Sequence, residues 1–75
     1  MSAIDDVCAV LRSFLSGRPL VGVTEIGDAL GAPKSSTSRL LAAMRDGGLL
    51  EQDPETLKYR PGLLLFRLGA IYLQN

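Results

Sequence analysis

Apolar residues recur at helical spacing near the start of the chain, at Ile4, Val7, Cys8, Leu11, Phe14 and Leu15. This spacing predicts an amphipathic helix. Ser2, followed three residues later by Asp5, is a suitable N-terminal cap, and Gly17 with Pro19 ends the helix. A second apolar stripe widens the face beyond what one packing neighbour needs, and it consists of Ala3, Val7, Val10 and Phe14.

A β-prone connection at 20–23 leads to a second, shorter helix. Thr24 is a suitable N-cap for a helix over 25–30, which Gly31 ends. Gly27 lies inside this helix, where glycine costs about 1 kcal/mol relative to alanine. A close crossing with another helix at Gly27 would explain the missing side chain.

A third helix is predicted over 33–46. Proline suits its first turn because proline lacks an N–H donor, and four consecutive hydroxyl residues at 35–38 favour a helix start over a helix interior. One stripe of this helix faces inward, at Thr37, Leu40, Leu41 and Met44, and Ser36 lies near the boundary. The outer face carries Lys34, Ser35, Ser38, Arg39, Ala42, Arg45 and Asp46.

Residues 49–60 predict a β-hairpin, in which two β-prone segments flank the turn Asp53-Pro54-Glu55-Thr56. Alternation along the second segment points Tyr59 inward and Lys58 and Arg60 outward. Pro61-Gly62 then ends the strand.

Residues 63–74 predict a final helix that is apolar almost all round. The core of so short a chain is too thin to cover every side of such a helix. We therefore expect a homodimer that forms through the first and last helices, with its interface at Ala3, Val7, Val10, Phe14, Leu64, Leu68, Ile71 and Tyr72.

The order of these elements is typical of a winged helix-turn-helix. The predicted fold is mainly α with a small β-hairpin wing: a three-helix core, a two-stranded wing and a C-terminal linker helix. Residues 1–62 would form the DNA-binding domain, and residues 63–75 would form the linker and dimerisation helix.

Composition narrows the function further. The single cysteine, Cys8, and the absence of histidine exclude an internal disulfide and argue against a zinc site. No nucleophile–base pair or phosphate-cradling loop is visible, so we expect neither an enzyme nor a cofactor. No segment resembles a signal peptide or a membrane span, and we expect a cytoplasmic protein with no membrane partner. The net charge is zero, but residues 34–75 carry six basic and four acidic side chains.

Several segments together carry a family pattern: TEIGDALGAPKS at 24–35, SRLL at 38–41, GLLE at 48–51, DPET at 53–56, YR at 59–60 and LG at 68–69. They are similar to the N-terminal DNA-binding domain of IclR-type bacterial transcriptional regulators, and the resemblance covers nearly all of the chain. It implies a dimeric repressor or activator whose small-molecule effector binds a separate C-terminal domain. That domain is absent from these residues, so we expect a fragment of a longer regulator or a reduced relative.

Three positions depart from the family pattern. Thr37 stands where valine is usual, Leu57 replaces a glycine of the wing turn, and Pro61 replaces leucine. The Leu57 departure leaves the turn type of the wing open.

In a helix-turn-helix the second helix of the motif enters the major groove of double-stranded DNA, with its N-terminal residues toward the base edges. Arg39 is suited to guanine and Ala42 to a thymine methyl group. The residues expected to face bases are Ser35, Ser36, Arg39 and Ala42. Those expected to contact phosphate are Thr24, Lys34, Ser38, Lys58 and Arg60.

Less specific interpretations exist for the same residues. Ser35 and Ser36 can serve only to cap the helix, and Lys58 and Arg60 can serve only to keep a strand edge soluble. For the whole chain, the first hypothesis is sequence-specific DNA binding by a dimer at a roughly palindromic operator. The alternative is a winged-helix protein–protein interaction module without DNA binding, which the zero net charge and the apolar last helix permit.

Overall fold

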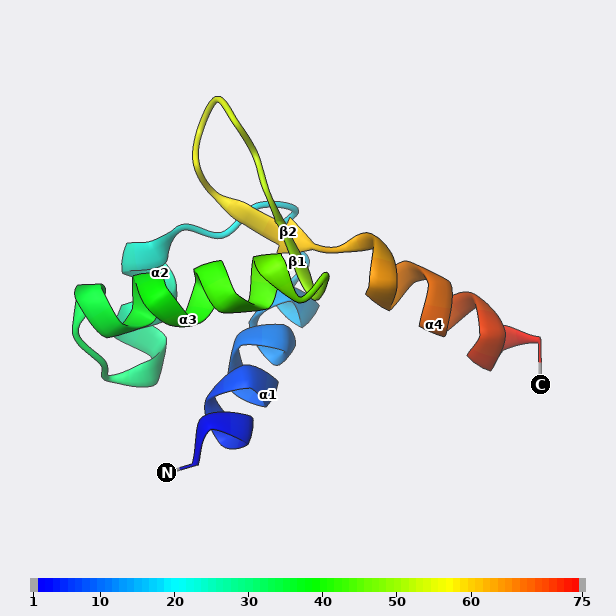
Figure 1. The fold of residues 1–75 in the computed structure, drawn as a ribbon, viewed down its shortest axis with the longest axis horizontal. Helices are drawn as coiled ribbons and strands as arrows, with labels where there is room; N and C mark the ends of the chain where they lie inside the picture. The colour runs from blue at the N-terminus through cyan, green and yellow to red at the C-terminus, as the bar shows by residue number, and fades with distance from the viewer. Residues whose placement is uncertain (1, 75) are drawn as a thin grey trace.

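Three helices cross one another around a small core in the computed structural model, which describes residues 2–74 (Figure 1). In chain order the elements are α1 (Ala3–Ser13), the 3-10 turn η1 (Phe14–Ser16), α2 (Val23–Leu30), α3 (Lys34–Asp46), β1 (Leu50–Gln52), β2 (Tyr59–Pro61) and α4 (Leu63–Leu73). This order confirms the winged helix-turn-helix that the sequence predicts.

The start of α1 is capped as the sequence indicates. The backbone N–H of Asp5 donates to the Ser2 hydroxyl at 3.3 Å, and the backbone N–H of Ser2 donates to the Asp5 carboxylate at 3.2 Å. This reciprocal pair is a capping box, which satisfies two backbone donors that have no partner within the helix.

The start of α2 differs from the prediction. The helix begins at Val23, and Gly22 is its N-cap, so Thr24 lies inside the first turn. The carboxylate of Glu25 accepts the backbone N–H of Gly22 at 3.1 Å, which performs the capping that Thr24 was expected to provide. At the other end, Gly31 ends the helix as predicted, with a left-handed φ of +66°.

The core takes apolar side chains from α1, α2, α3, both strands and the connection before α2, at Val10, Val21, Ile26, Leu41, Met44, Leu50 and Tyr59. The position of Val10 corrects a prediction. Its side chain is 1% exposed, so Val10 belongs to the core of the monomer and has no surface left for a partner. The inward position predicted for Tyr59 is confirmed.

β1 and β2 pair antiparallel, with Glu51 opposite Arg60 and Gln52 opposite Tyr59. The hairpin was predicted over 49–60, but each strand has only three residues and β2 includes Pro61, which pairs with Leu50 and was expected to end the strand. Val21, in the connection before α2, adds a bridge to Tyr59, and two backbone hydrogen bonds of 2.8 Å join these residues. The hairpin is therefore tied to the helical core through Tyr59.

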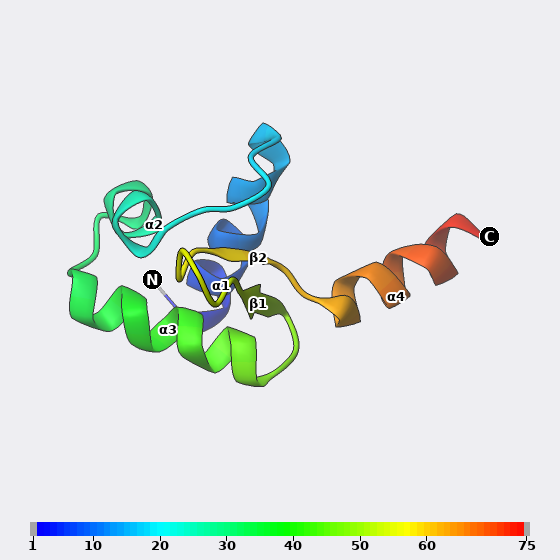
Figure 2. The same cartoon turned by 90° about the horizontal axis from the view of Figure 1, so that it is seen from above.

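Two parts of the chain stand away from this core. The loop between β1 and β2 protrudes as the wing, and α4 projects away from the core on the side opposite α2 (Figures 1 and 2). Among the described residues of α4 none is buried. Within residues 2–74, no helix has the length and apolar character that crossing a bilayer requires.

Candidate nucleic-acid interface

α3 presents one buried and one exposed face. Thr37, Leu41 and Met44 are buried against the core. The exposed side chains on the other side are Lys34, Ser35, Ser38, Arg39, Arg45 and Asp46. This division follows the predicted periodicity. It leaves the outer face of α3 uncovered, as a helix that enters the major groove of DNA requires.

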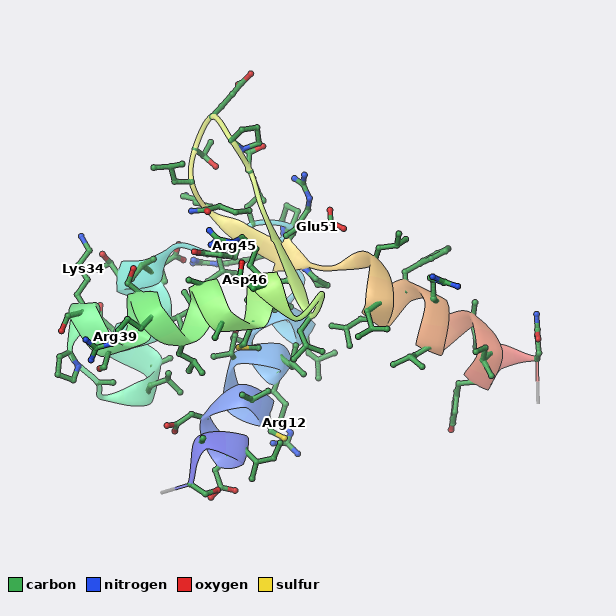
Figure 3. All side chains as sticks on the ribbon, in the orientation of Figure 1. Arg12, Lys34, Arg39, Arg45, Asp46 and Glu51 are labelled. Carbon is green, nitrogen blue, oxygen red and sulfur yellow. The ribbon has the colours of Figure 1, made fainter. Side chains whose placement is uncertain are left out.

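Two of the four predicted base-facing residues are fully on this outer face. Ser35 and Arg39 are exposed, whereas Ser36 and Ala42 are half-buried. The hydroxyl of Ser36 donates to the backbone oxygen of Pro33 at 3.1 Å, so it already serves the helix start. Arg39 extends from the outer side of α3 (Figure 3).

A groove of about 450 Å³ lies between the start of α2, the first turns of α3 and the wing. We call it the wing groove. Its lining residues are Gly22, Val23, Thr24, Glu25, Lys34, Ser38, Gln52, Thr56, Leu57, Lys58 and Tyr59. The structure thus brings together four residues from three distant parts of the sequence that were predicted to contact phosphate, namely Thr24, Lys34, Ser38 and Lys58.

The one carboxylate that lines the wing groove, that of Glu25, already has hydrogen-bond and ion-pair partners within the protein. Glu25 accepts the Gly22 backbone N–H and forms an ion pair with Arg18. Lys34 and Lys58 flank the same groove, and Lys34 points toward the side on which the wing stands (Figure 3). Two lysines beside hydroxyl groups and the N-terminus of α2 make a region suited to an anionic backbone.

Arg60, the fifth residue predicted to contact phosphate, does not line this groove. Its guanidinium lies on the hairpin, with Nε 3.5 Å from Glu51 Oε1 and Nη1 3.8 Å from Asp53 Oδ1. Two carboxylates therefore already neutralise part of its charge. The cross-strand register, which places Glu51 opposite Arg60, creates this arrangement.

The wing loop is held by its own polar groups. The carboxylate of Asp53 accepts both the backbone N–H and the hydroxyl of Thr56, each at 2.8 Å. These hydrogen bonds, with the nearby positive charge of Arg60 as a smaller cause, hold the pKa of Asp53 below its usual range. Leu57 has a φ of +63°, the left-handed conformation that glycine adopts most easily. The glycine-to-leucine departure noted in the sequence therefore falls at a strained position.

Sequence reasoning missed two groups of polar contacts. Arg45 donates to the side chain of Gln52, which in turn donates to the Leu57 backbone oxygen. The carboxylate of Glu51 accepts the backbone N–H of Leu63 at 2.9 Å, at the start of α4. No periodicity or motif signals either group, because each joins residues on different elements.

The residues predicted for a dimer interface differ in exposure. On α1, Ala3 is exposed, whereas Val7 and Phe14 are half-buried and pack against the core. On α4, the predicted residues are all exposed, from Leu64 at 40% to Tyr72 at 81%, with Leu68 and Ile71 between. Phe66 and Leu73 of α4 are exposed as well.

No group of three potential metal ligands occurs among residues 2–74. The half-buried thiol of Cys8 lies on α1.

Comparison with known proteins gives consistent results. A family model described as the IclR helix-turn-helix domain matches residues 3–54. The chain is 37% identical over 76 residues to the HTH-type transcriptional regulator KdgR of Escherichia coli, and the match covers 95% of this chain and 29% of KdgR. It is 30% identical over 73 residues to the glycerol operon regulatory protein of Streptomyces coelicolor, covering 97% of this chain and 29% of that protein.

A solved structure of an IclR family transcriptional regulator from Brucella abortus superimposes with a TM-score of 0.83 at 32% identity. That match covers 100% of this chain and 28% of the Brucella chain. The chain therefore spans less than a third of the length of each of these relatives.

Proposed function

Because this chain belongs to the IclR helix-turn-helix family, we propose that it binds double-stranded operator DNA as a homodimer and thereby regulates transcription. The observation that carries the proposal is the convergence of Thr24, Lys34, Ser38 and Lys58 in the wing groove, beside the exposed face of α3. The sequence neighbours are themselves regulators, which favours this function over a protein–protein interaction module.

The proposed mode of binding places α3 in the major groove. Arg39 and Ser35 then face base edges, with Arg39 suited to the O6 and N7 atoms of guanine. Ala42 is left to apolar contact with a thymine methyl group, and Ser36 contributes at the edge of the interface. One DNA strand would pass along the wing groove, where lysines and hydroxyl groups contact phosphate and fix the register of α3.

Arg60 can contact phosphate only if its side chain changes its present ion pairs. Its guanidinium must leave Glu51 and Asp53 at least in part before it can contact phosphate. We therefore assign phosphate binding first to Lys34 and Lys58 and treat Arg60 as a secondary contact.

We propose that α4 supplies most of the dimer contact. Leu68, Ile71 and Tyr72 are exposed on a helix that projects away from its own core, and Ala3 with the uncovered parts of Val7 and Phe14 adds surface from α1. An exposed apolar surface of this kind is typical of protein–protein contact. Sedimentation of the chain and of a Leu68→Lys variant tests this assignment: we expect a dimer that the variant disrupts, and a monomer at tens of micromolar for both proteins would contradict it.

Control by a small molecule would require a C-terminal domain outside these residues, and the chain spans only 29% of the length of the relatives from Streptomyces coelicolor and Escherichia coli. Such a regulator would act in the cytoplasm.

Selection of bound duplexes from a random pool at fixed salt tests DNA binding directly. The affinity for the selected duplex is then measured over a range of salt concentrations. Two groove lysines in each protomer give four phosphate-neutralising cations in a dimer, so we expect a slope of about −4 in log K against log salt. A flat salt response would contradict the proposal and favour the protein-association alternative.

A further inference from the structure

Two hydrogen bonds in series connect the end of α3 to the wing loop. Arg45 Nη1 donates to Gln52 Oε1 at 2.8 Å, and Gln52 Nε2 donates to the Leu57 backbone oxygen at 3.0 Å. We propose that Arg45 and Gln52 are positioning residues that hold the wing in place relative to α3, so that Arg45 affects DNA affinity without touching DNA. The DNA part of this inference rests on the proposed function.

The neighbours of Gln52 determine which way round its side-chain amide lies. An amide side chain has one acceptor oxygen and one donor nitrogen. A guanidinium offers only donors, so it must face the oxygen, and the backbone oxygen of Leu57 must then face the nitrogen. One orientation of the amide satisfies both neighbours, and it is the orientation observed.

The peptide group that Gln52 holds is the one before Lys58. The oxygen of this Leu57–Lys58 peptide accepts from Gln52, and its N–H donates to the Thr56 hydroxyl at 3.2 Å. Both edges of the peptide are therefore fixed. Because this peptide sets the direction in which the backbone enters Lys58, the connection governs where that side chain lies in the wing groove.

The wing needs such a support, because packing contributes little to it. Residues 54–58 are all exposed, and the Leu57 side chain is 60% exposed. Leu57 also holds a left-handed φ, which for a non-glycine residue persists only where the surroundings over-determine it. The hydrogen bond from Gln52 to the Leu57 oxygen acts at this same strained residue.

The guanidinium of Arg45 is already engaged on the protein. Its Nε lies 3.2 Å from Asp46 Oδ1, while its Nη1 serves Gln52. Figure 3 shows Arg45 and Asp46 together on α3 beneath the wing. An arginine held by two acceptors of its own chain is better suited to positioning than to reading DNA.

The first test uses the protein without DNA. NMR order parameters of the amides of 53–58 are compared between the wild type and the variants Gln52→Leu, Gln52→Glu, Arg45→Ala and Arg45→Lys. Arg12→Ala is the matched control, since Arg12 is an exposed arginine on α1, away from the wing (Figure 3).

We expect the Lys58 amide to become mobile in Gln52→Leu and Arg45→Ala, with an order parameter below about 0.6. Gln52→Glu keeps an acceptor for Arg45 but loses the donor to Leu57, so it should match Gln52→Leu. Arg45→Lys, which retains a donor, should restore part of the order, and Arg12→Ala should resemble the wild type. Unchanged order in Gln52→Leu and Arg45→Ala would overturn the proposal.

The second test is a double-mutant cycle with Lys58→Ala, measured as affinity for the selected duplex at fixed salt. Gln52→Leu changes no charge. In the protein that keeps Lys58, we expect this substitution to weaken binding about three- to tenfold. In the Lys58→Ala background both Gln52→Leu and Arg45→Ala should have little further effect, because the side chain that they position is gone. If the affinity losses of Arg45→Ala and Lys58→Ala multiply instead, Arg45 contacts DNA itself. That result would overturn the proposal that Arg45 affects DNA affinity through the position of Lys58.

The two proposals fail in different ways. A wild-type chain that binds no duplex removes the proposed function, while the order parameters of the free protein still decide whether Arg45 and Gln52 hold the wing.

Discussion

Gly27 of α2 lies directly against Thr37 of α3: a Cβ atom on Gly27 would be 3.3 Å from the Thr37 hydroxyl oxygen. It would also be 3.3 Å from the backbone oxygen of Ala32, in the turn between the two helices. The Thr37 side chain is 1% exposed, and its hydroxyl donates to the Pro33 backbone oxygen at 2.9 Å, so this buried polar group is satisfied. The crossing fixes the direction in which α3 presents its outer face.

We expect Gly27→Ala to destabilise the domain by about 1 kcal/mol in urea unfolding. Alanine should gain about 1 kcal/mol of helix propensity, but overpacking against Ala32 and Thr37 costs about 1–3 kcal/mol. The loss should be smaller in a Thr37→Ala background, where the hydroxyl is gone. A variant as stable as the wild type would show that the two helices shift apart freely.

The sequence predicts this crossing well, because a glycine inside a helix, followed by a second glycine in the next turn, is typical of two helices in close contact. Helical periodicity likewise identifies the buried faces of α1 and α3. It does not identify which neighbour covers a face, and for that reason Val10 was expected at an interface and lies in the core. The start of α2 was misplaced because side-chain capping preference favours Thr24, whereas the observed cap uses the carboxylate of Glu25.

The candidate interface was predictable where it depends on position along an element. Thr24, Lys34, Ser38 and Lys58 were each selected from their place on a helix or strand, and the fold brings them to one groove. The environment of Arg60 was not predictable, because it depends on the register that places Glu51 opposite it. Contacts between side chains on different elements can be identified only once the three-dimensional arrangement of those elements is known.

Replacing Leu57 tests the strain in the wing. We expect Leu57→Gly to raise the free energy of unfolding by about 0.5 kcal/mol, since glycine removes a left-handed cost of about 1–2 kcal/mol but adds entropy to the unfolded chain. Leu57→Ala is the matched control: it removes the same exposed side chain but keeps the unfavourable φ, so it should give no gain. If the two variants unfolded at the same urea concentration, the left-handed φ of residue 57 would not be the cause of any gain in stability.

Gly62 fixes the start of α4 through close backbone packing. A Cβ atom there would lie 2.4 Å from the Gly48 backbone oxygen and 3.0 Å from backbone atoms of Leu49 and Leu50. These atoms cannot move as a side chain would, so Gly62→Ala should destabilise the domain by about 2–3 kcal/mol. Gly69→Ala, inside α4, is the control, because nothing lies within 4 Å of its Cβ position. Similar urea midpoints for the two variants would refute the contact.

The wing should lose order in acid. Because its hydrogen bonds to Thr56 lower the pKa of Asp53, the carboxylate stabilises the folded wing fully above the ordinary carboxyl pKa of about 4. That stabilisation is lost as the pH falls through the lowered pKa. We expect the NMR shift of the Thr56 amide to titrate with a midpoint below the ordinary value. Asp53→Asn should remove this transition, and a midpoint at or above the ordinary value would contradict the role of the hydrogen bonds.

Arg39 and Lys34 should affect DNA binding in different ways, because one is proposed to read bases and the other to contact phosphate. Arg39→Ala should cost about 1–3 kcal/mol on the selected duplex and relax preference at one base pair in each half-site. Lys34→Ala should weaken binding to all duplexes about equally and reduce the salt slope by about 1 for each protomer. Arg12→Ala serves as the charge-matched control on α1, away from the wing, and should change neither quantity (Figure 3). If Arg39→Ala weakened all sequences equally, Arg39 would be a phosphate contact and the reading of bases would fall to other residues of α3.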